Sequence, residues 1–177
     1  MHPIKHFKTI TYHKYLVMKY CFRLGLYWQG LVHDLSKYGP TEFLVGAKYY
    51  QGTCSPNNAE RLDKGYSEAW LHHQGRNKHH FEYWIDYSTD RQKEPLRSVE
   101  MPARYLAEMF CDRVAASRNY LGAKYTDASA YDYYMKSSAP HLIAPKTAKL
   151  LEQALYVLKQ HGEPAAFAWV KKNILKK

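Results

Sequence analysis

Hydrophobic residues recur every three or four positions along most of the chain, which is the spacing of one face of an α-helix. In the first such segment the apolar stripe consists of Tyr12, Leu16, Tyr20 and Leu24, and lysine and arginine take the other faces. The alternation of period two that is typical of strands is not evident. The pattern therefore predicts an all-α fold.

Proline and glycine indicate where these helices begin and end, because proline suits the first turn of a helix and glycine follows the last. Pro40 and Pro102 stand at expected starts, Ser67 is an expected N-cap, and Gly122 and Gly162 stand at expected ends. The expected helices span residues 9–27, 28–37, 40–50, 68–73, 79–86, 103–121, 127–138, 145–160 and 163–177. A loop or lid is expected over 51–65, and a polar surface connection over 87–100.

The length of 177 residues fits one domain, 1–177, which is long enough to bury a core. Its core is expected over about 9–122, followed by C-terminal helices over about 127–177. Hydrophobic residues make up 46% of the chain and charged residues 24%, a globular composition. The net charge of +10 favours an anionic partner, which charge alone does not identify: a phosphorylated small molecule, nucleic acid or a membrane surface.

The three cysteines are odd in number and lack C-x-x-C spacing, which argues against a disulfide framework or a structural zinc site. The first residues lack the apolar core of a signal peptide, and no uncharged apolar run reaches the length of a membrane span. We therefore expect a cytoplasmic protein in a reducing compartment, with no membrane contact. The sequence does not indicate an oligomeric state.

The chemistry centres on residues 31–37, which read LVHDLSK and contain the adjacent pair His33 and Asp34. An imidazole nitrogen and a carboxylate oxygen can bind one divalent metal, and the second carboxylate oxygen can bridge to another. The other candidate ligands are His13, His72, His73, His79, His80 and Asp112. They fall on four or five expected helices, and helices packed side by side can project such groups into one cavity.

Each of these residues also has an ordinary structural explanation. His13 alone would be a partly exposed helix residue, and His33 and Asp34 could be a hydrogen-bonded pair at a helix end. Asp112 could form a salt bridge with Arg113 or Arg118. The four histidines of 72–80 could belong to a solvated loop, and Lys37 could simply complement a helix dipole. The basic residues of 171–177 fit a solvated face, with nucleic-acid docking as a minor alternative.

Taken together, the ligands resemble the HD superfamily of metal-dependent phosphohydrolases, whose signature is a His, then His-Asp, then a distant Asp on a helical core. Many members carry two more histidines between the His-Asp pair and the last Asp, for a second metal. The segments HDLSKYGPTEF and AWLHHQGRNKHHFEYW resemble a small HD branch known only as a domain of unknown function. The resemblance covers about 9–122 and implies an HD-domain-like helical bundle with a buried metal site.

By this resemblance the first metal would be held by His13, His33, Asp34 and Asp112. Asp34 would bridge to a second metal held by His72 and His80, with His73 and His79 as their rivals. The cofactor would be one or two divalent transition metals, and His/Asp ligation suits Mn, Fe, Co, Ni or Zn.

The resemblance implies a phosphohydrolase that acts on a nucleotide or another small phosphate ester. A metal-bound water would attack phosphorus. Lys37 and Arg76 are the expected phosphate-binding residues, with Lys78 a weaker candidate. Asp34 and Lys37 would act at the catalytic centre, and an unligated histidine, His73 or His79, would protonate the leaving group.

Two other functions remain open at this stage. Some HD proteins use two irons and oxygen to oxidise a substrate, and the histidine cluster permits this chemistry. A non-enzymatic HD-fold module that binds nucleic acid is the third possibility. It is not favoured, because clusters of aromatic and basic residues typical of single-strand readers are not evident.

Overall fold

A computed structural model describes residues 1–90, 92 and 94–176. In these residues the chain forms nine α-helices: α1 (Pro3–Arg23), α2 (Tyr27–Val32), α3 (Pro40–Lys48), α4 (Pro56–Lys64), α5 (Glu68–Gln74), α6 (Ala103–Leu121), α7 (Ser129–Lys136), α8 (Ala139–Leu142) and α9 (Pro145–Asn173). Short 3-10 helices occupy Leu35–Tyr38, Phe81–Trp84 and Gly122–Lys124. The predicted all-α class is confirmed.

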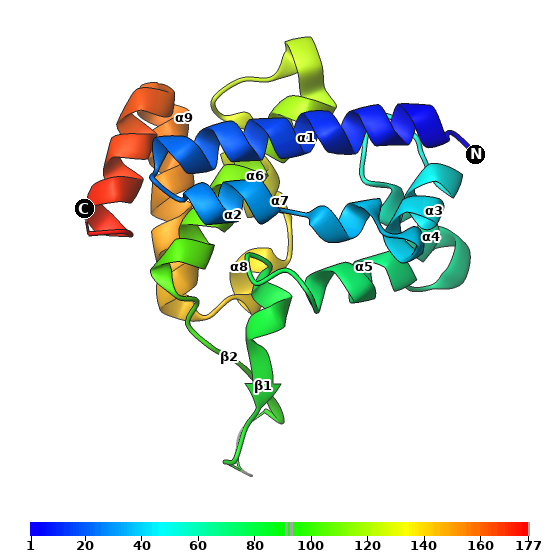
Figure 1. The fold of residues 1–177 in the computed structure, drawn as a ribbon. Coiled ribbons are helices and arrows are strands. Elements are labelled where there is room, and N and C mark those ends of the chain that lie inside the picture. Colours follow the sequence, from blue (N-terminus) through cyan, green and yellow to red (C-terminus); the bar gives the residue numbers. More distant parts are fainter. Residues whose placement is uncertain (91, 93, 177) are drawn as a thin grey trace.

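The long helix α1 runs along one side of the molecule, with α2 and α3 beside it (Figure 1). Helix α6 packs against α1 from the interior, and α9 packs against α6 and α7. The largest contributions to the core come from α1, α6 and α9: Leu16, Val17, Tyr20, Leu106, Phe110, Val114, Leu151, Leu155 and Leu158. Each such side chain contributes about 1.5–3 kcal/mol by burial. The α1–α6 contact matters for function, because both helices carry candidate ligands.

Helix α1 begins at Pro3, six residues before the expected start. Pro3 occupies the first turn, and the backbone N–H of His2 donates to the carbonyl of Ala47 at 2.7 Å, which ties this end to α3. His6 is buried there, against Gly46. A buried histidine does not register as part of an apolar stripe, so the pattern did not extend the helix this far.

The loop expected over 51–65 is wrong for Pro56–Lys64, which forms α4. Ser55 is its N-cap and accepts a hydrogen bond from the backbone N–H of Asn57 at 3.4 Å. The only side chain this helix buries in full is Glu60, whose carboxylate accepts from Ser67 Oγ at 2.6 Å. A helix that buries a carboxylate rather than apolar residues has no hydrophobic period to detect.

A two-stranded antiparallel hairpin, β1 (Ile85–Tyr87) and β2 (Leu96–Ser98), projects from the helical body (Figure 1). It replaces part of the polar connection expected over 87–100, of which residues 91 and 93 lie outside the described residues. The helix expected over 79–86 is also wrong: the chain there forms the 3-10 turn Phe81–Trp84 and enters β1. The hairpin is too short for its alternation to stand out in the sequence.

Most other predicted helices are present, and two of them are joined into one helix. The helices expected over 68–73 and 103–121 are α5 and α6, and Ser67 Oγ accepts from the N–H of Trp70 at 3.0 Å as the expected N-cap. The segment 127–138 holds α7, followed by the separate α8. The last two expected helices form α9, interrupted where Gly162 adopts a φ of 75°. Lys177 of the basic tail lies outside the described residues.

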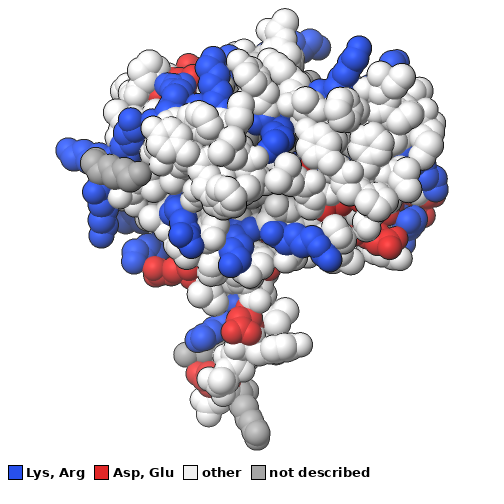
Figure 2. Space-filling model, viewed as in Figure 1, with Lys and Arg blue, Asp and Glu red and all other residues white. Residues whose placement is uncertain are grey.

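The cysteines Cys21, Cys54 and Cys111 are all free thiols, in agreement with the absence of a disulfide framework. Among the described helices, none combines the length and apolar character that crossing a bilayer requires. Lysine and arginine are spread widely over the face seen in Figure 2, with few acidic residues between them.

Candidate metal centre

The His-Asp pair lies in the break between two helices and not inside one. Helix α2 ends at Val32, and Asp34 has φ 54° and ψ 26°, in the left-handed region. The single helix expected over 28–37 is therefore wrong. A non-glycine residue in this region is uncommon and stores strain, although aspartate tolerates it better than most. The turn buries both side chains, leaving His33 1% and Asp34 2% exposed.

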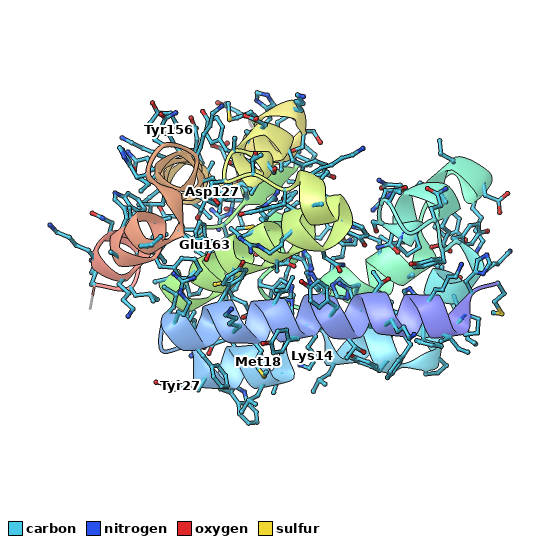
Figure 3. All side chains as sticks on the ribbon, turned by 90° about the horizontal axis from the view of Figure 1, so that it is seen from above. Lys14, Met18, Tyr27, Asp127, Tyr156 and Glu163 are labelled. Carbon is cyan, nitrogen blue, oxygen red and sulfur yellow. The ribbon has the colours of Figure 1, made fainter. Side chains whose placement is uncertain are left out.

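Lys14 stabilises this break from α1. Its ammonium group donates to the carbonyl of Leu31 at 2.7 Å and to that of His33 at 2.9 Å, which satisfies acceptors left free where α2 ends. Lys14 projects from α1 toward the side on which α2 lies (Figure 3). The position of the His-Asp pair is therefore tied directly to the helix that carries His13.

A first group of side chains gathers His13 from α1, His33 and Asp34 from the break, and Asp112 from α6, with the ligand atoms within 4.8 Å of one another. His13 Nε2 lies 3.0 Å from Asp112 Oδ1 and 3.6 Å from Asp34 Oδ2. His33 Nε2 lies 3.3 Å from the same Asp34 oxygen. Residues nearly 100 positions apart thus face one point.

A second group surrounds the other oxygen of Asp34. His73 Nε2 lies 3.3 Å and His79 Nε2 3.4 Å from Asp34 Oδ1. His80 completes the group, with its Nε2 2.9 Å from that of His73. Asp34 therefore presents one carboxylate oxygen to each group, the arrangement in which a carboxylate can bridge two metal ions.

Several polar atoms at the centre of these groups lack hydrogen-bond partners. Four buried atoms are in this condition: Nε2 of His13, His33 and His79, and Oδ1 of Asp34. A buried polar group without a partner costs about 1–3 kcal/mol, more if it is charged. A divalent cation accepts electron pairs from imidazole nitrogen and carboxylate oxygen alike, so the donor set fits one in each group.

Two carboxylates behind the histidines orient them. Glu108 Oε1 lies 2.9 Å from Nδ1 of His33 and 3.1 Å from Nδ1 of His79. Glu42 likewise contacts Nδ1 of His72 at 2.7 Å and of His73 at 2.8 Å. When Nδ1 donates its hydrogen to such a carboxylate, the lone pair of Nε2 is left facing inward, as in many metal sites.

Neither carboxylate was among the predicted site residues. Glu108 stands four positions before Asp112 on the same helix, and that spacing, which puts two residues on one helix face, was the available signal. Glu42 is the third residue of α3 and carries no comparable signal. Both become recognisable only when the helices are packed.

The electrostatics of the cluster favour bound cations. Burial raises the pKa of Asp34, but the positive charges of His33 and Lys37 outweigh it and hold that pKa well below its usual range. Burial also favours a raised pKa for Asp112, but His13 outweighs this effect and holds that pKa well below its usual range. Burial lowers the pKa of His79, yet Asp34 and Glu108 raise it to about 10. The carboxylates are therefore ionised at neutral pH, and in the absence of metal the charges of Lys37 and of protonated His79 balance part of theirs.

Of the doubled histidines, the structure places His73, His79 and His80 in the second group and leaves His72 outside it. His72 and His73 are neighbours on α5, so their side chains point about 100° apart around the helix axis. The His72 side chain is 25% exposed and reaches Glu42 only. The position expected for His72 beside the second metal is taken by His73.

The predicted phosphate-binding residues are placed differently from one another. Lys37 forms an ion pair with Asp34 Oδ2 at 2.5 Å and lines a cavity beside the cluster. Arg76 is exposed, donates to the carbonyl of His72 at 3.2 Å and does not line that cavity. Lys78 is exposed, with its ammonium 5.5 Å from the ring of Tyr83. Only Lys37 is positioned to meet a ligand in the cavity.

The cavity has a volume of about 660 Å³, within the usual range for small-molecule sites. The cluster contributes one part of its lining: His13, Lys37, His73, His80 and Asp112. The lining also includes polar side chains from α4, α6, α7 and the Phe81–Trp84 turn: Arg61, Glu82, Arg113, Tyr120 and Tyr133. The predicted site therefore adjoins a space that a small substrate can fill.

Comparison with known proteins gives one match. Residues 2–157 match a family described as "Family of unknown function (DUF5662)". No curated protein and no solved structure matches the chain. The matched region contains every side chain of the two groups.

Proposed function

The chain belongs to DUF5662, a family of unknown function, and we propose from its site that it is a metal-dependent phosphohydrolase of the HD type. The substrate would be a nucleotide or another small phosphate ester. The observation that carries the proposal is the convergence of four buried, unpartnered atoms, three imidazole nitrogens and one oxygen of Asp34, from distant parts of the chain.

The order of the residues supports the HD assignment. His13, His33-Asp34 and Asp112 follow one another as in the HD signature, and their ligand atoms share the first group. The second group adds three histidines between Asp34 and Asp112, where HD proteins with two metals carry theirs. The helical setting agrees as well.

In this proposal the first metal would be held by His13, His33, Asp34 and Asp112, and the second by Asp34, His73, His79 and His80. A divalent metal in this site would supply a lowered pKa for a water molecule, so that hydroxide could form near neutral pH. Mn, Fe, Co, Ni and Zn all suit such ligands.

The protein's own groups supply the remaining requirements. Lys37 lines the cavity, and the Asp34 carboxylate raises the pKa of its ammonium against the effect of burial, so it stays charged and can attract a phosphate oxygen. His73 lines the cavity as well, whereas His79 does not. If only the first group holds a metal, His73 is the better placed of the two to protonate the leaving group.

The proposal is tested by phosphate release from a broad panel of nucleotides and small phosphate esters. The chelated protein should be inactive, and Mn, Co, Ni, Fe or Zn should restore release. Lys37→Met should lower kcat/KM, whereas Lys172→Met, a change at an exposed lysine of α9, should not. Absence of metal-dependent release from the whole panel would contradict the proposal.

One observation also fits a second function. Asp34 faces two histidine-rich groups with its two oxygens, and a pair of irons bridged by a carboxylate would also fit. An HD-type di-iron oxygenase would contain iron as isolated and consume oxygen in the presence of its substrate. Those two readouts separate it from a hydrolase.

A further inference from the structure

The lining of the cavity includes a guanidinium group that has no carboxylate partner within the described residues. Arg113 follows Asp112 on α6 and lines the cavity. Its Nε is buried and has no hydrogen-bond partner, and its guanidinium lies 5.1 Å from the ring centre of Tyr134. By contrast, Arg23 and Arg118 each form an ion pair with Glu163 at 2.7 Å. In the described chain, no acidic side chain pairs with Arg113 in this way.

A carboxylate that lines the same cavity also has a buried oxygen without a hydrogen-bond partner. Glu82 belongs to the Phe81–Trp84 turn, two residues after His80, and its Oε2 is buried without a hydrogen-bond partner. Burial raises the pKa of Glu82, and the positive charges of Arg113 and Arg61 oppose that rise. Glu82 and Arg113 thus line one cavity, and no salt bridge joins them within the described residues.

Burying a charged group without a partner costs free energy, unless a ligand supplies the missing hydrogen bonds or the opposite charge. The edge of a guanidinium that contains Nε matches the two oxygens of a carboxylate or phosphate. A glutamate carboxylate accepts hydrogen bonds from hydroxyl or amino groups. Arg61 also lines the cavity, but it already has partners: it donates to Asn58 Oδ1 at 2.9 Å, and its guanidinium lies 5.5 Å from the ring centre of Trp70.

We propose that Arg113 and Glu82 form a subsite for the leaving group of the substrate. Arg113 binds a second anionic group, and Glu82 accepts a hydrogen bond from a neighbouring hydroxyl or amino group. The substrate class is then a phosphate monoester whose leaving group carries a carboxylate or a second phosphate beside such a donor. This inference rests on the proposed phosphohydrolase function and narrows its substrate.

The reaction balances without a further reactant. The oxygen of water forms a bond to phosphorus, and the bond between phosphorus and the ester oxygen breaks. The products are inorganic phosphate and an alcohol that has gained a proton. The alcohol keeps its second anionic group, which remains beside Arg113 until the product dissociates.

Matched pairs of substrates test the subsite on the metal-loaded protein. O-phospho-L-serine and phosphoethanolamine differ by a carboxylate. 3-phosphoglycerate carries a carboxylate where glycerol 3-phosphate carries an uncharged hydroxymethyl group. A nucleoside 3′,5′-bisphosphate and the corresponding 5′-monophosphate differ by a phosphate. We expect the member with the second anion to have the higher kcat/KM in at least one kind of pair, which identifies the anion. Loss of a charge-assisted contact predicts a ratio of roughly 10 to 100.

Arg113→Met should remove this ratio, and Arg113→Lys should restore part of it. The matched control is Arg104→Met, at an exposed position of the same helix, which should keep the ratio of the parent. Glu82→Gln should lower the advantage of O-phospho-L-serine over the phosphate ester of 3-hydroxypropionate, which lacks the amine. Metal content and circular dichroism verify that the Arg113 and Glu82 variants are folded and loaded.

The outcomes separate the subsite from the function on which it rests. Hydrolysis of both members of every pair at equal kcat/KM would overturn the subsite and leave the phosphohydrolase in place. A ratio that survives Arg113→Met would overturn the role of Arg113. If the loaded parent hydrolyses no member of any pair, calorimetric dissociation constants for the same pairs decide the subsite. Tighter binding of the second anion, lost in Arg113→Met, supports it, and equal binding overturns it.

Discussion

Glu108 lies 2.9 Å from Nδ1 of His33, although the two residues are 75 positions apart in the chain. The same carboxylate oxygen is 3.1 Å from Nδ1 of His79, so one side chain orients a histidine of each group. Glu108 is buried on α6, one helical turn before Asp112. If each Nδ1 donates its hydrogen to this carboxylate, each Nε2 is left free to bind a metal. Glu108 does not line the cavity itself.

Glu108→Gln should weaken metal binding roughly 10- to 100-fold, the usual cost of losing a carboxylate behind a ligating histidine. The amide is nearly the same size but does not stabilise the donated hydrogen as an anion does. Competition with a chromophoric chelator measures the affinity. Glu68→Gln, at an exposed position of α5, is the control and should bind as the parent does. Equal affinities in the two variants would refute the role of Glu108.

Substitutions of Asp34 and of His80 should differ in how many metal ions the protein loses. Asp34→Asn disturbs both groups, because each receives one of its oxygens, whereas His80→Ala disturbs only the second. We expect the Asn variant to lose metal from both groups and the Ala variant to keep about one ion. Elemental analysis after dialysis against each metal gives the numbers. Identical stoichiometry in the two variants would contradict the shared position of Asp34.

Gly46→Ala should destabilise the fold by about 1–3 kcal/mol. A Cβ at this position would lie 2.2 Å from Nε2 of His6, so α1 and α3 would have to separate or the imidazole would have to move. Urea unfolding measures the effect. Gly75→Ala is the control, because its added carbon would meet only the Leu71 carbonyl at 3.4 Å. The double variant His6→Ala/Gly46→Ala lacks the imidazole, so it should recover part of the lost stability. If it recovers none, the clash with His6 is not the cause of the destabilisation.

His6 should make the metal-free protein less stable as the pH falls from about 6.5 toward 4. Burial, aided by the charge of Lys37, lowers the pKa of His6 from 6.5 to about 4. Over this window the unfolded chain binds a proton that the native state does not, so acid favours unfolding. The free energy of unfolding, measured by urea at pH 7 and pH 5 with chelator present, should fall less in His6→Phe than in the parent. An equal fall would show that His6 does not contribute.

Motif spacing and helix-end chemistry predicted much of the fold and the first group. Pro102 and Gly122 delimited α6 because their backbone preferences act locally. The order of His13, His33-Asp34 and Asp112 identified residues that the structure brings together. Histidine and aspartate can be recognised as candidate metal ligands from the sequence, because their side chains carry the donor atoms. Ser67 predicted the start of α5 through the same local capping logic.

The remainder depends on contacts between distant segments. Neighbouring His72 and His73 are equivalent in the sequence, and only the packing of α5 against α3 decides which one faces Asp34. The left-handed turn at Asp34 is set by the tertiary contacts of α2, Lys14 among them. Arg113 was considered only as a salt-bridge partner of Asp112, because its place on a cavity wall follows from helices that lie far away in the sequence.

The metal content of the protein, purified without chelator or added metal, tests the central claim most directly. The parent should retain near-stoichiometric divalent transition metal, while His33→Ala and Asp112→Ala lose it with their helicity intact. His161→Ala, at an exposed position of α9, should retain it. Joint loss in the first two variants would place residues of the His-Asp break and of α6 in one metal site. A parent that contains no metal and takes up none of Mn, Fe, Co, Ni or Zn would contradict the account.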